Sequence, residues 1–397
     1  MTVPSVAPVV RYRGPLTVLC CLAMFLYAVY FGAIGVILPS LGETFGLGPA
    51  VQGALFPAQF AGFVPGVILA GYLSDRFGRK GVLLIGIAAY ALGLLCFGIA
   101  PQFGWLLAAS VLIGGGSGAM ETVASVLATD LYPERRAFVV NALQIAFGAG
   151  AAVGPYVAQI LLGNGLSWRS LYFGFMAANL ALFAMLAFIP LGRTDSGDDE
   201  AIDFRALIRI LRQPAYLALC LAQALYVGAE VAFGSWMPTY FRLLPGGIPL
   251  SGPVVTIFWI AMTIGRTIVS PLAGRIPLLR LTIVLALLSA VFAVGTLLTD
   301  TPVTVTVCVV GVGLCFSGIF GLILAEAGER YPAVSGSAFG GIMASGGVGG
   351  ALLPWLVGIA ATLPFGWRGA LLLVPIASLG VALLAYAVGR KTVTTVP

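Results

Sequence analysis

Two acidic residues lie deep inside apolar stretches of this chain. Glu121 falls within the run Leu106–Thr129, and Glu230 lies in the middle of a later run. An ionised carboxylate at the centre of a bilayer costs at least ~2.5–3.5 kcal/mol, so such an acid is normally protonated, paired, or turned toward a polar cavity. The positions of the two acids therefore predict that they bind and release a proton or another cation inside a membrane. The alternative for each is a protonated side chain tied to a neighbouring helix.

Polar and aromatic residues accompany these acids on the same or neighbouring runs. Tyr226 precedes Glu230 by four residues, so the two share a helix face. Arg266 lies in the next run, where it either snorkels toward the cytoplasm or meets a central carboxylate or a ligand. For the aromatic residues, the alternative is ordinary packing. We predict a small-molecule site from these residues: Glu121, Gln144, Asn141, Glu230, Tyr226, Trp259, Arg266, Tyr27, Tyr30 and Trp236.

The composition is that of a polytopic helical membrane protein. Hydrophobic residues make up 60% of the 397 residues and charged residues only 9%, whereas soluble proteins carry about 25% charged residues. The net charge of +6 does not indicate nucleic-acid binding, because the basic residues lie in short segments between apolar runs. The 6 cysteines lie within apolar runs and histidine is absent, so we predict no metal site. We also find no nucleophile–base set and no nucleotide-binding loop, and predict that the chain is not an enzyme.

Membrane-length apolar runs define the expected fold. A helix needs about 20 apolar residues to cross a bilayer, and twelve runs meet this requirement. We therefore predict an all-α membrane protein with twelve transmembrane helices. Their approximate ranges are 16–39, 50–73, 81–100, 104–129, 137–163, 168–191, 214–240, 252–273, 279–298, 302–327, 333–361 and 368–388.

An offset of 199 residues aligns the two halves of the chain. The matched pairs include Tyr27 with Tyr226, Pro39 with Pro238, Pro155 with Pro354, and Arg169 with Arg368. Halves with an even number of spans have the same orientation, and in transporters built from such repeats the binding site lies between them near the midplane. We predict two pseudo-symmetric six-helix bundles, 1–192 and 213–397, joined by a cytoplasmic linker at 193–212.

The basic residues also predict the orientation. Most of the 20 Lys and Arg residues fall on one side of the membrane if both termini are placed there. Cytoplasmic loops carry an excess of Lys and Arg, so both termini are predicted to be cytoplasmic. The expected location is the inner or plasma membrane, where the chain would be a monomer in the lipid bilayer.

The segment between the second and third spans reads Gly71-Tyr-Leu-Ser-Asp75-Arg76-Phe-Gly78-Arg79-Lys80. It resembles the signature loop of the major facilitator superfamily, and the resemblance extends over essentially the whole chain. It implies a secondary transporter with this loop as a cytoplasmic latch. Asp75 would face the N-terminal dipole of the eleventh span, and Arg76 or Arg79 would pair with Asp130. The expected gate residues are Gly71, Asp75, Arg76, Gly78, Arg79, Asp130, Arg275 and Glu329.

A narrower resemblance comes from spans four and five. Met120-Glu121-Thr-Val-Ala-Ser125 and Asn141-Ala-Leu-Gln144 are similar to the fucose:proton symporter branch, which includes sodium-dependent glucose carriers. In fucose symporters the span-four glutamate is protonatable and lies at the sugar site, and the span-five glutamine contacts sugar. The resemblance implies the same roles for Glu121 and Gln144. The end of span one departs from the branch, because Phe31-Gly-Ala-Ile stands where fucose symporters carry Asp and Asn.

These observations lead to a functional hypothesis of alternating-access uptake of a neutral, sugar-like solute. No cofactor is expected beyond H+ or Na+ as coupling ion, with Glu121 and Glu230 as coupling residues. The alternative is a proton-driven exporter of drugs and other amphiphilic compounds. It is favoured by the partial resemblance of Gly150-Ala-Ala-Val-Gly154-Pro155 to the span-five motif of drug antiporters.

Overall fold

The computed structural model describes residues 12–189 and 210–390, apart from a few side chains at helix ends, among them that of Asp75. Within these ranges twelve helical segments are long and apolar enough to cross a membrane, which confirms the predicted fold. The predicted linker 193–212 lies almost wholly outside the described residues. The helices are α2 (Arg13–Phe45), α3 (Pro49–Gly53), α4 (Leu55–Phe77), α5 (Arg79–Gly98), α6 (Phe103–Leu131), α7 (Arg136–Gly163), α8 (Trp168–Phe188), α10 (Pro214–Leu243), α11 (Pro253–Ala273), α12 (Leu278–Gly295), α13 (Pro302–Arg330), α14 (Ser335–Ala360), α15 (Gly366–Leu371) and α16 (Leu373–Gly389).

Proline accounts for the two spans that are built from two helices each. Helix α3 ends at Gly53, and Pro57 follows four residues later. Helix α15 ends at Leu371, and Pro375 again follows four residues later. Because proline has no N–H, it cannot bond to the carbonyl four residues before it, and its ring crowds that carbonyl. The second and twelfth spans therefore break at equivalent distances from a proline.

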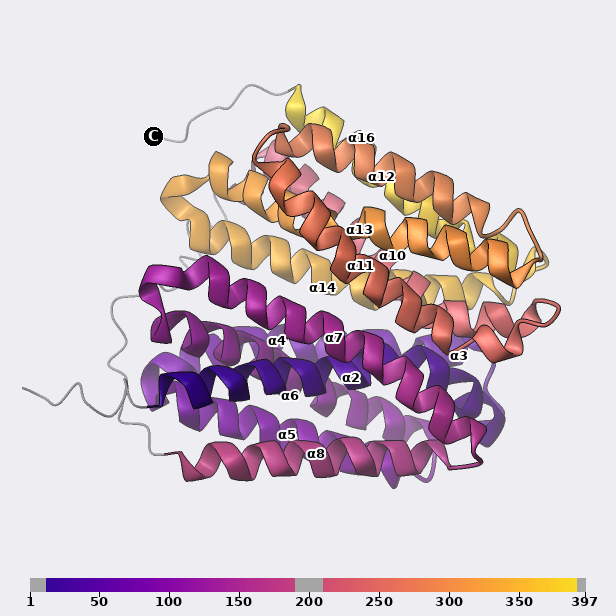
Figure 1. Ribbon diagram of the computed structural model, residues 1–397, viewed down its shortest axis with the longest axis horizontal. Coiled ribbons are helices and arrows are strands. Elements are labelled where there is room, and N and C mark those ends of the chain that lie inside the picture. The colour runs from indigo at the N-terminus through magenta and orange to yellow at the C-terminus, as the bar shows by residue number, and fades with distance from the viewer. Residues whose placement is uncertain (1–11, 190–209, 391–397) are drawn as a thin grey trace, which may run out of the picture. The chain divides into compact units, whose positions relative to one another are not determined.

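Of the described residues, 12–33 and 58–189 form one compact unit. In this unit α5 contacts both α6 and α8 along its length (Figure 1). Helix α4 approaches α6 closely, because a Cβ added to Gly62 or Gly66 would collide with backbone atoms of α6. Small residues at a contact allow two membrane helices to pack backbone to backbone. This close contact holds α6, the helix that carries Glu121.

Of the described residues, 34–57 and 210–390 form the second unit. In this unit α10 contacts α14 and α16, while α13 contacts α11 and α12 (Figure 1). The short helix α3 packs on α14, where a Cβ added to Gly53 would press on Trp355. This unit therefore includes the end of span one and the start of span two in addition to the C-terminal helices.

The offset of 199 residues recurs in the backbone contacts. In each half, two glycines each approach a different backbone carbonyl oxygen so closely that an added Cβ would collide with it. The glycines and the carbonyls of one half match those of the other half at the same offset. These matched contacts follow the internal duplication that the sequence predicts. The matched contacts are Gly150 with Phe25 and Gly349 with Ala224, then Gly114 with Gln59 and Gly313 with Phe258.

Replacing Gly349 by alanine is expected to destabilise the second unit. The new Cβ would collide with the carbonyl oxygen of Ala224, which belongs to the rigid backbone of α10. Overpacking of this kind costs about 1–3 kcal/mol. The thermal midpoint in detergent is the measurement, and Gly321→Ala is the control because a Cβ there meets nothing within 4 Å. Equal midpoints for the two variants would contradict the close contact.

Candidate functional site

Three of the predicted site residues come together inside the second unit. Tyr226 and Glu230 lie one turn apart on α10, and Arg266 lies on the neighbouring α11. The Tyr226 hydroxyl is within hydrogen-bonding reach of the Glu230 carboxyl, and Arg266 is close enough to interact electrostatically with it. The same hydroxyl donates to the backbone carbonyl of Phe316 on α13 at 2.9 Å. A membrane-buried acid thus has a cationic neighbour and a fixed phenol beside it.

Aromatic rings border this cluster. Trp259 is buried and precedes Arg266 by seven residues, or two turns, on α11. Phe258 packs edge to face on Trp259 at 5.5 Å and on Phe316 at 6.4 Å, while Tyr226 packs on Phe316 at 5.6 Å. Rings in this arrangement form an apolar wall with little freedom to move. Arg266 lies two turns along α11 from this wall and is half-buried.

The predicted residues of the first unit lie on α6 and α7. Glu121 on α6 and Gln144 on α7 are both half-buried, and Asn141 is exposed. Helices α6 and α7 contact each other. Within the described part of the chain, Glu121 has no ion-pair partner, whereas Glu230 lies beside Arg266. The two intramembrane acids therefore have different electrostatic surroundings.

Three predicted aromatic residues are buried in side-chain packing. Tyr27 packs against Phe147 at 5.6 Å, and the hydroxyl of buried Tyr30 donates to Gln59 at 3.3 Å. Trp236 is fully buried, its indole N–H donates to the Pro354 carbonyl at 2.8 Å, and its ring packs on Phe56 and Trp367. These contacts are those of core residues, which is the packing alternative considered for them above. The full list of candidate ligands stays a prediction.

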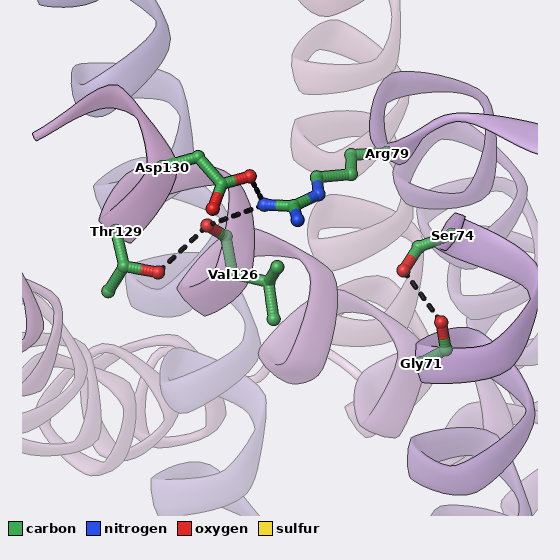
Figure 2. Close-up of polar contacts among 6 residues, drawn as sticks. All are labelled: Gly71, Ser74, Arg79, Val126, Thr129 and Asp130. Atoms are coloured by element: carbon green, nitrogen blue, oxygen red, sulfur yellow. Dashed lines mark hydrogen bonds and ion pairs between the residues drawn. The ribbon is translucent and has the colours of Figure 1, made fainter. Parts of the chain in front are cut away.

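The latch loop of the first unit contains a buried ion pair. Figure 2 shows the guanidinium of Arg79, at the start of α5, paired with the carboxylate of Asp130 at the end of α6. Arg79 is 3% exposed and also donates to the Val126 carbonyl at 3.3 Å, which accepts a second bond from Thr129. Arg76, by contrast, is exposed and donates to the Tyr72 hydroxyl at 3.1 Å. Of Arg76 and Arg79, the two arginines considered as partners of Asp130, it is Arg79 that forms the ion pair.

Glycine shapes the same loop. Gly78 has φ of +85°, a conformation that residues with a side chain rarely adopt, and it separates α4 from α5. The carbonyl of Gly71 accepts a hydrogen bond from Ser74 at 2.8 Å (Figure 2). The side chain of Asp75 lies outside the described residues, so its predicted contact with a helix dipole stays a prediction.

The second half has a different ion pair at the corresponding end of α13. Arg275 and Glu329, the residues that align with the latch, are both exposed. Glu326 instead pairs with Arg330, and Arg330 also donates to the Val388 carbonyl of α16 at 3.3 Å. Sequence reasoning missed Arg330 because it followed the alignment of the two halves. The four-residue spacing of Glu326 and Arg330 on one helix was the signal that indicated this pair.

Comparison with known proteins identifies the family. The Major Facilitator Superfamily matches residues 20–354. The chain belongs to the Major Facilitator Superfamily. It is therefore an integral membrane protein and a secondary transporter, not an enzyme.

The relatives of this superfamily member include carriers of aromatic acids. The 4-hydroxybenzoate transporter PcaK of Pseudomonas putida is 32% identical over 182 residues, which cover 45% of this chain and 40% of that protein. The match thus spans about two fifths of that relative. The gallate transporter of Pseudomonas putida is 26% identical over 411 residues, covering 89% of this chain and 90% of that protein. The crystal structure of the nucleoside transporter NupG has a TM-score of 0.78 at 16% identity, covering 96% of this chain and 99% of that one, and shows the fold alone.

The comparisons do not support the predicted place in the fucose:proton symporter branch. The E. coli fucose:proton symporter FucP matches with a TM-score of 0.65 at 20% identity, covering 94% of this chain and 98% of that chain. The sequence relatives named above carry aromatic acids, so a sugar-like substrate is not supported either. The resemblance rested on a few polar positions in spans four and five. Side chains such as Glu and Gln hydrogen-bond many solutes, so these positions do not determine the substrate.

Proposed function

We propose that this protein takes up a small aromatic carboxylate together with a cation, by alternating access. The observation that carries the proposal is Arg266, a cation within a membrane-spanning helix, beside Glu230 and an aromatic wall. The planar guanidinium matches a carboxylate with two parallel hydrogen bonds. An aromatic ring would pack on Trp259, as aromatic pairs do in apolar sites. The aromatic acids named for the relatives carry the same two chemical features.

The coupling ion in this proposal is H+, with Na+ as the alternative. Two carboxyl groups inside the spans, Glu121 and Glu230, would take up and release it, because the chain contains no histidine. We further propose that the protein lies in the cell membrane with both termini in the cytoplasm, as the distribution of basic residues predicts. Asn141 and Gln144 stay candidate ligands in this proposal.

Reconstitution into liposomes tests the proposed function. Labelled 4-hydroxybenzoate and gallate are offered under an inward proton gradient, an inward sodium gradient, or no gradient. We expect accumulation of an aromatic acid above the level of protein-free liposomes, driven by one of the two gradients. Labelled fucose and glucose, and an amphiphilic dye, are run in parallel. Accumulation of a sugar, or efflux of the dye, without transport of either acid would contradict the proposal and favour the corresponding alternative.

The variant Glu121→Gln is expected to lose coupled uptake while the protein is still made and inserted. Glutamine keeps the size of the side chain but cannot release a proton, so a step that needs the charged form is blocked. Gradient-driven uptake in liposomes should fall to the level of protein-free liposomes. Glu134→Gln is the control, since this acid is exposed in the turn that follows α6, where it lies 3.8 Å from Arg13. Full coupled uptake by the Glu121 variant would rule out its coupling role.

A further inference from the structure

We infer that the adjoining ends of α12 and α16, on the proposed cytoplasmic side, bind the headgroup of an anionic phospholipid. Arg280 near the start of α12 and Arg390 directly after α16 would hold the phosphate, and the acyl chains would lie along the two helices. The inference goes beyond the proposed function and does not depend on it, because neither arginine is a candidate ligand for the transported solute.

The two arginines come from helices that contact each other (Figure 1). A Cβ added to Gly389 would lie 3.6 Å from the Cδ1 atom of Leu279, so the end of α16 meets the start of α12. Arg390 and Arg280 are the residues that follow these two. Because neighbouring helices pack with their axes about 8–10 Å apart, two long arginine side chains at this point can reach one headgroup. The fold therefore brings together two cations that are far apart in the sequence.

No acidic side chain pairs with either cation within the described part of the chain. Arg280 and Arg390 are both exposed there, and neither forms an ion pair. Helix α13 contacts α12 and carries two acids at its end. Of these, Glu326 is paired with Arg330, and Glu329 is exposed. Two like charges at adjoining helix ends repel each other, and an anion between them replaces this repulsion by attraction. Arginine also binds phosphate through two parallel hydrogen bonds.

Each arginine lies at the end of an exposed apolar stripe that runs along one face of its helix. The members of each stripe recur in steps of three or four residues, which places them on the same helix face as the arginine. A membrane-spanning helix contacts lipid chains with its exposed apolar face. A phospholipid whose headgroup lies at the arginines therefore has its acyl chains against both stripes. The stripe of α12 consists of Val284, Leu287, Leu288 and Val291, and that of α16 consists of Tyr386, Leu383, Leu379 and Ile376.

Tyr386 restrains one of the two cations. Its ring is exposed, and the guanidinium carbon of Arg390 lies 5.8 Å from the ring centroid. A cation at this distance is attracted to the face of the ring, so the guanidinium is held beside the stripe of α16. Tyrosine is enriched where a membrane meets water, at the depth of the headgroups. Arg390 is therefore expected to lie at the depth where a lipid phosphate is available.

The first test compares the thermal midpoint of the purified full-length protein in detergent after addition of three probes. Phosphatidylglycerol is expected to raise the midpoint by at least about 2 °C, because a ligand that binds only the folded state stabilises it. Phosphatidylcholine, whose headgroup has no net charge, should raise the midpoint clearly less. Glycerol 3-phosphate carries the negative charge without acyl chains, and it should have no effect at the same concentration.

The second test measures the Kd of phosphatidylglycerol by native mass spectrometry in the wild type and in variants. We expect Arg280→Gln and Arg390→Gln each to bind this lipid about fivefold more weakly than the wild type, because each loses one cation near the anionic headgroup. The double variant should bind about 25-fold more weakly. The matched control is Arg13→Gln with Arg135→Gln, which removes two arginines from the proposed cytoplasmic side of the first unit. It should bind as the wild type does.

The outcomes distinguish this site from a general effect of charge. Equal midpoint shifts with the two phospholipids would overturn the inference. A double variant that binds phosphatidylglycerol as tightly as the wild type would overturn it, and so would a control that loses as much affinity as the double variant. A shift with glycerol 3-phosphate equal to that with phosphatidylglycerol would indicate a site for soluble phosphate, which also overturns the assignment to a lipid.

The single variants keep the test decisive if the double variant does not fold. Each retains one arginine, and the side chain that it replaces is exposed, so the packing of α12 on α16 is preserved. Wild-type affinity for phosphatidylglycerol in both single variants would overturn the inference.

Discussion

Replacing Arg266 by glutamine is expected to weaken binding of 4-hydroxybenzoate at least about 30-fold. Removing one partner of a desolvated, hydrogen-bonded charge pair costs about 2–5 kcal/mol, and 1.4 kcal/mol corresponds to a factor of ten in Kd. The reason is specific to this site, because Arg266 is the cation beside the aromatic wall of Trp259 and Phe258. Calorimetric Kd values of the wild type and the variant, measured at the same pH, give the direct comparison.

Three further variants distinguish the loss of a substrate-binding side chain from a loss of folding. Arg266→Gln leaves Glu230 without its cation, so the double variant with Glu230→Gln should recover thermal stability but not anion binding. Arg266→Lys keeps the charge without the planar fork and should bind with intermediate affinity. Arg280→Gln removes an exposed arginine at the start of α12 and should not change the Kd. An unchanged Kd in Arg266→Gln would remove the main support for the proposed substrate class.

Replacing Asp130 by asparagine is expected to lower the stability of the first unit by about 3 kcal/mol. Removing one member of a buried ion pair leaves the other charge without compensation, at a cost of about 3–5 kcal/mol. Arg79 is 3% exposed, so water cannot replace the lost carboxylate (Figure 2). The lower end of the range applies because Asp130 itself is 24% exposed. The expected readout is a lower thermal midpoint in detergent.

The matched control is an ion pair at the same end of the same unit. Glu134 lies 3.8 Å from Arg13, and both side chains are about a third or more exposed. Exposed pairs contribute roughly 0–1 kcal/mol, so Glu134→Gln should leave the midpoint nearly unchanged. The double variant Arg79→Met and Asp130→Leu should recover part of the loss, because neither charge is then left alone. Similar midpoints for the two single variants would show that the Arg79–Asp130 pair is not buried in the membrane protein.

Residue types and spacing were enough to relate the latch loop to its family. They did not predict which residues of the loop contact one another. Arg76 and Arg79 are three residues apart, and the sequence favoured neither as partner of Asp130. The structure ends α4 at Phe77, turns at Gly78 and begins α5 at Arg79. The two arginines therefore belong to different helices, and only Arg79 points at α6. Helix termination, which depends on one glycine, decided the pair.

The sequence by itself determined the twelve spans, the duplication and the unusual position of Glu121 and Glu230. These properties follow from the transfer free energy of each local run of residues and from residue identity at a fixed offset. Only the tertiary structure placed Arg266 beside Glu230 and buried Trp236 among Phe56 and Trp367. Which side chains meet depends on the rotation of each helix about its axis and on its neighbours. In a membrane, where most faces of a helix are equally apolar, hydropathy carries little information about that rotation.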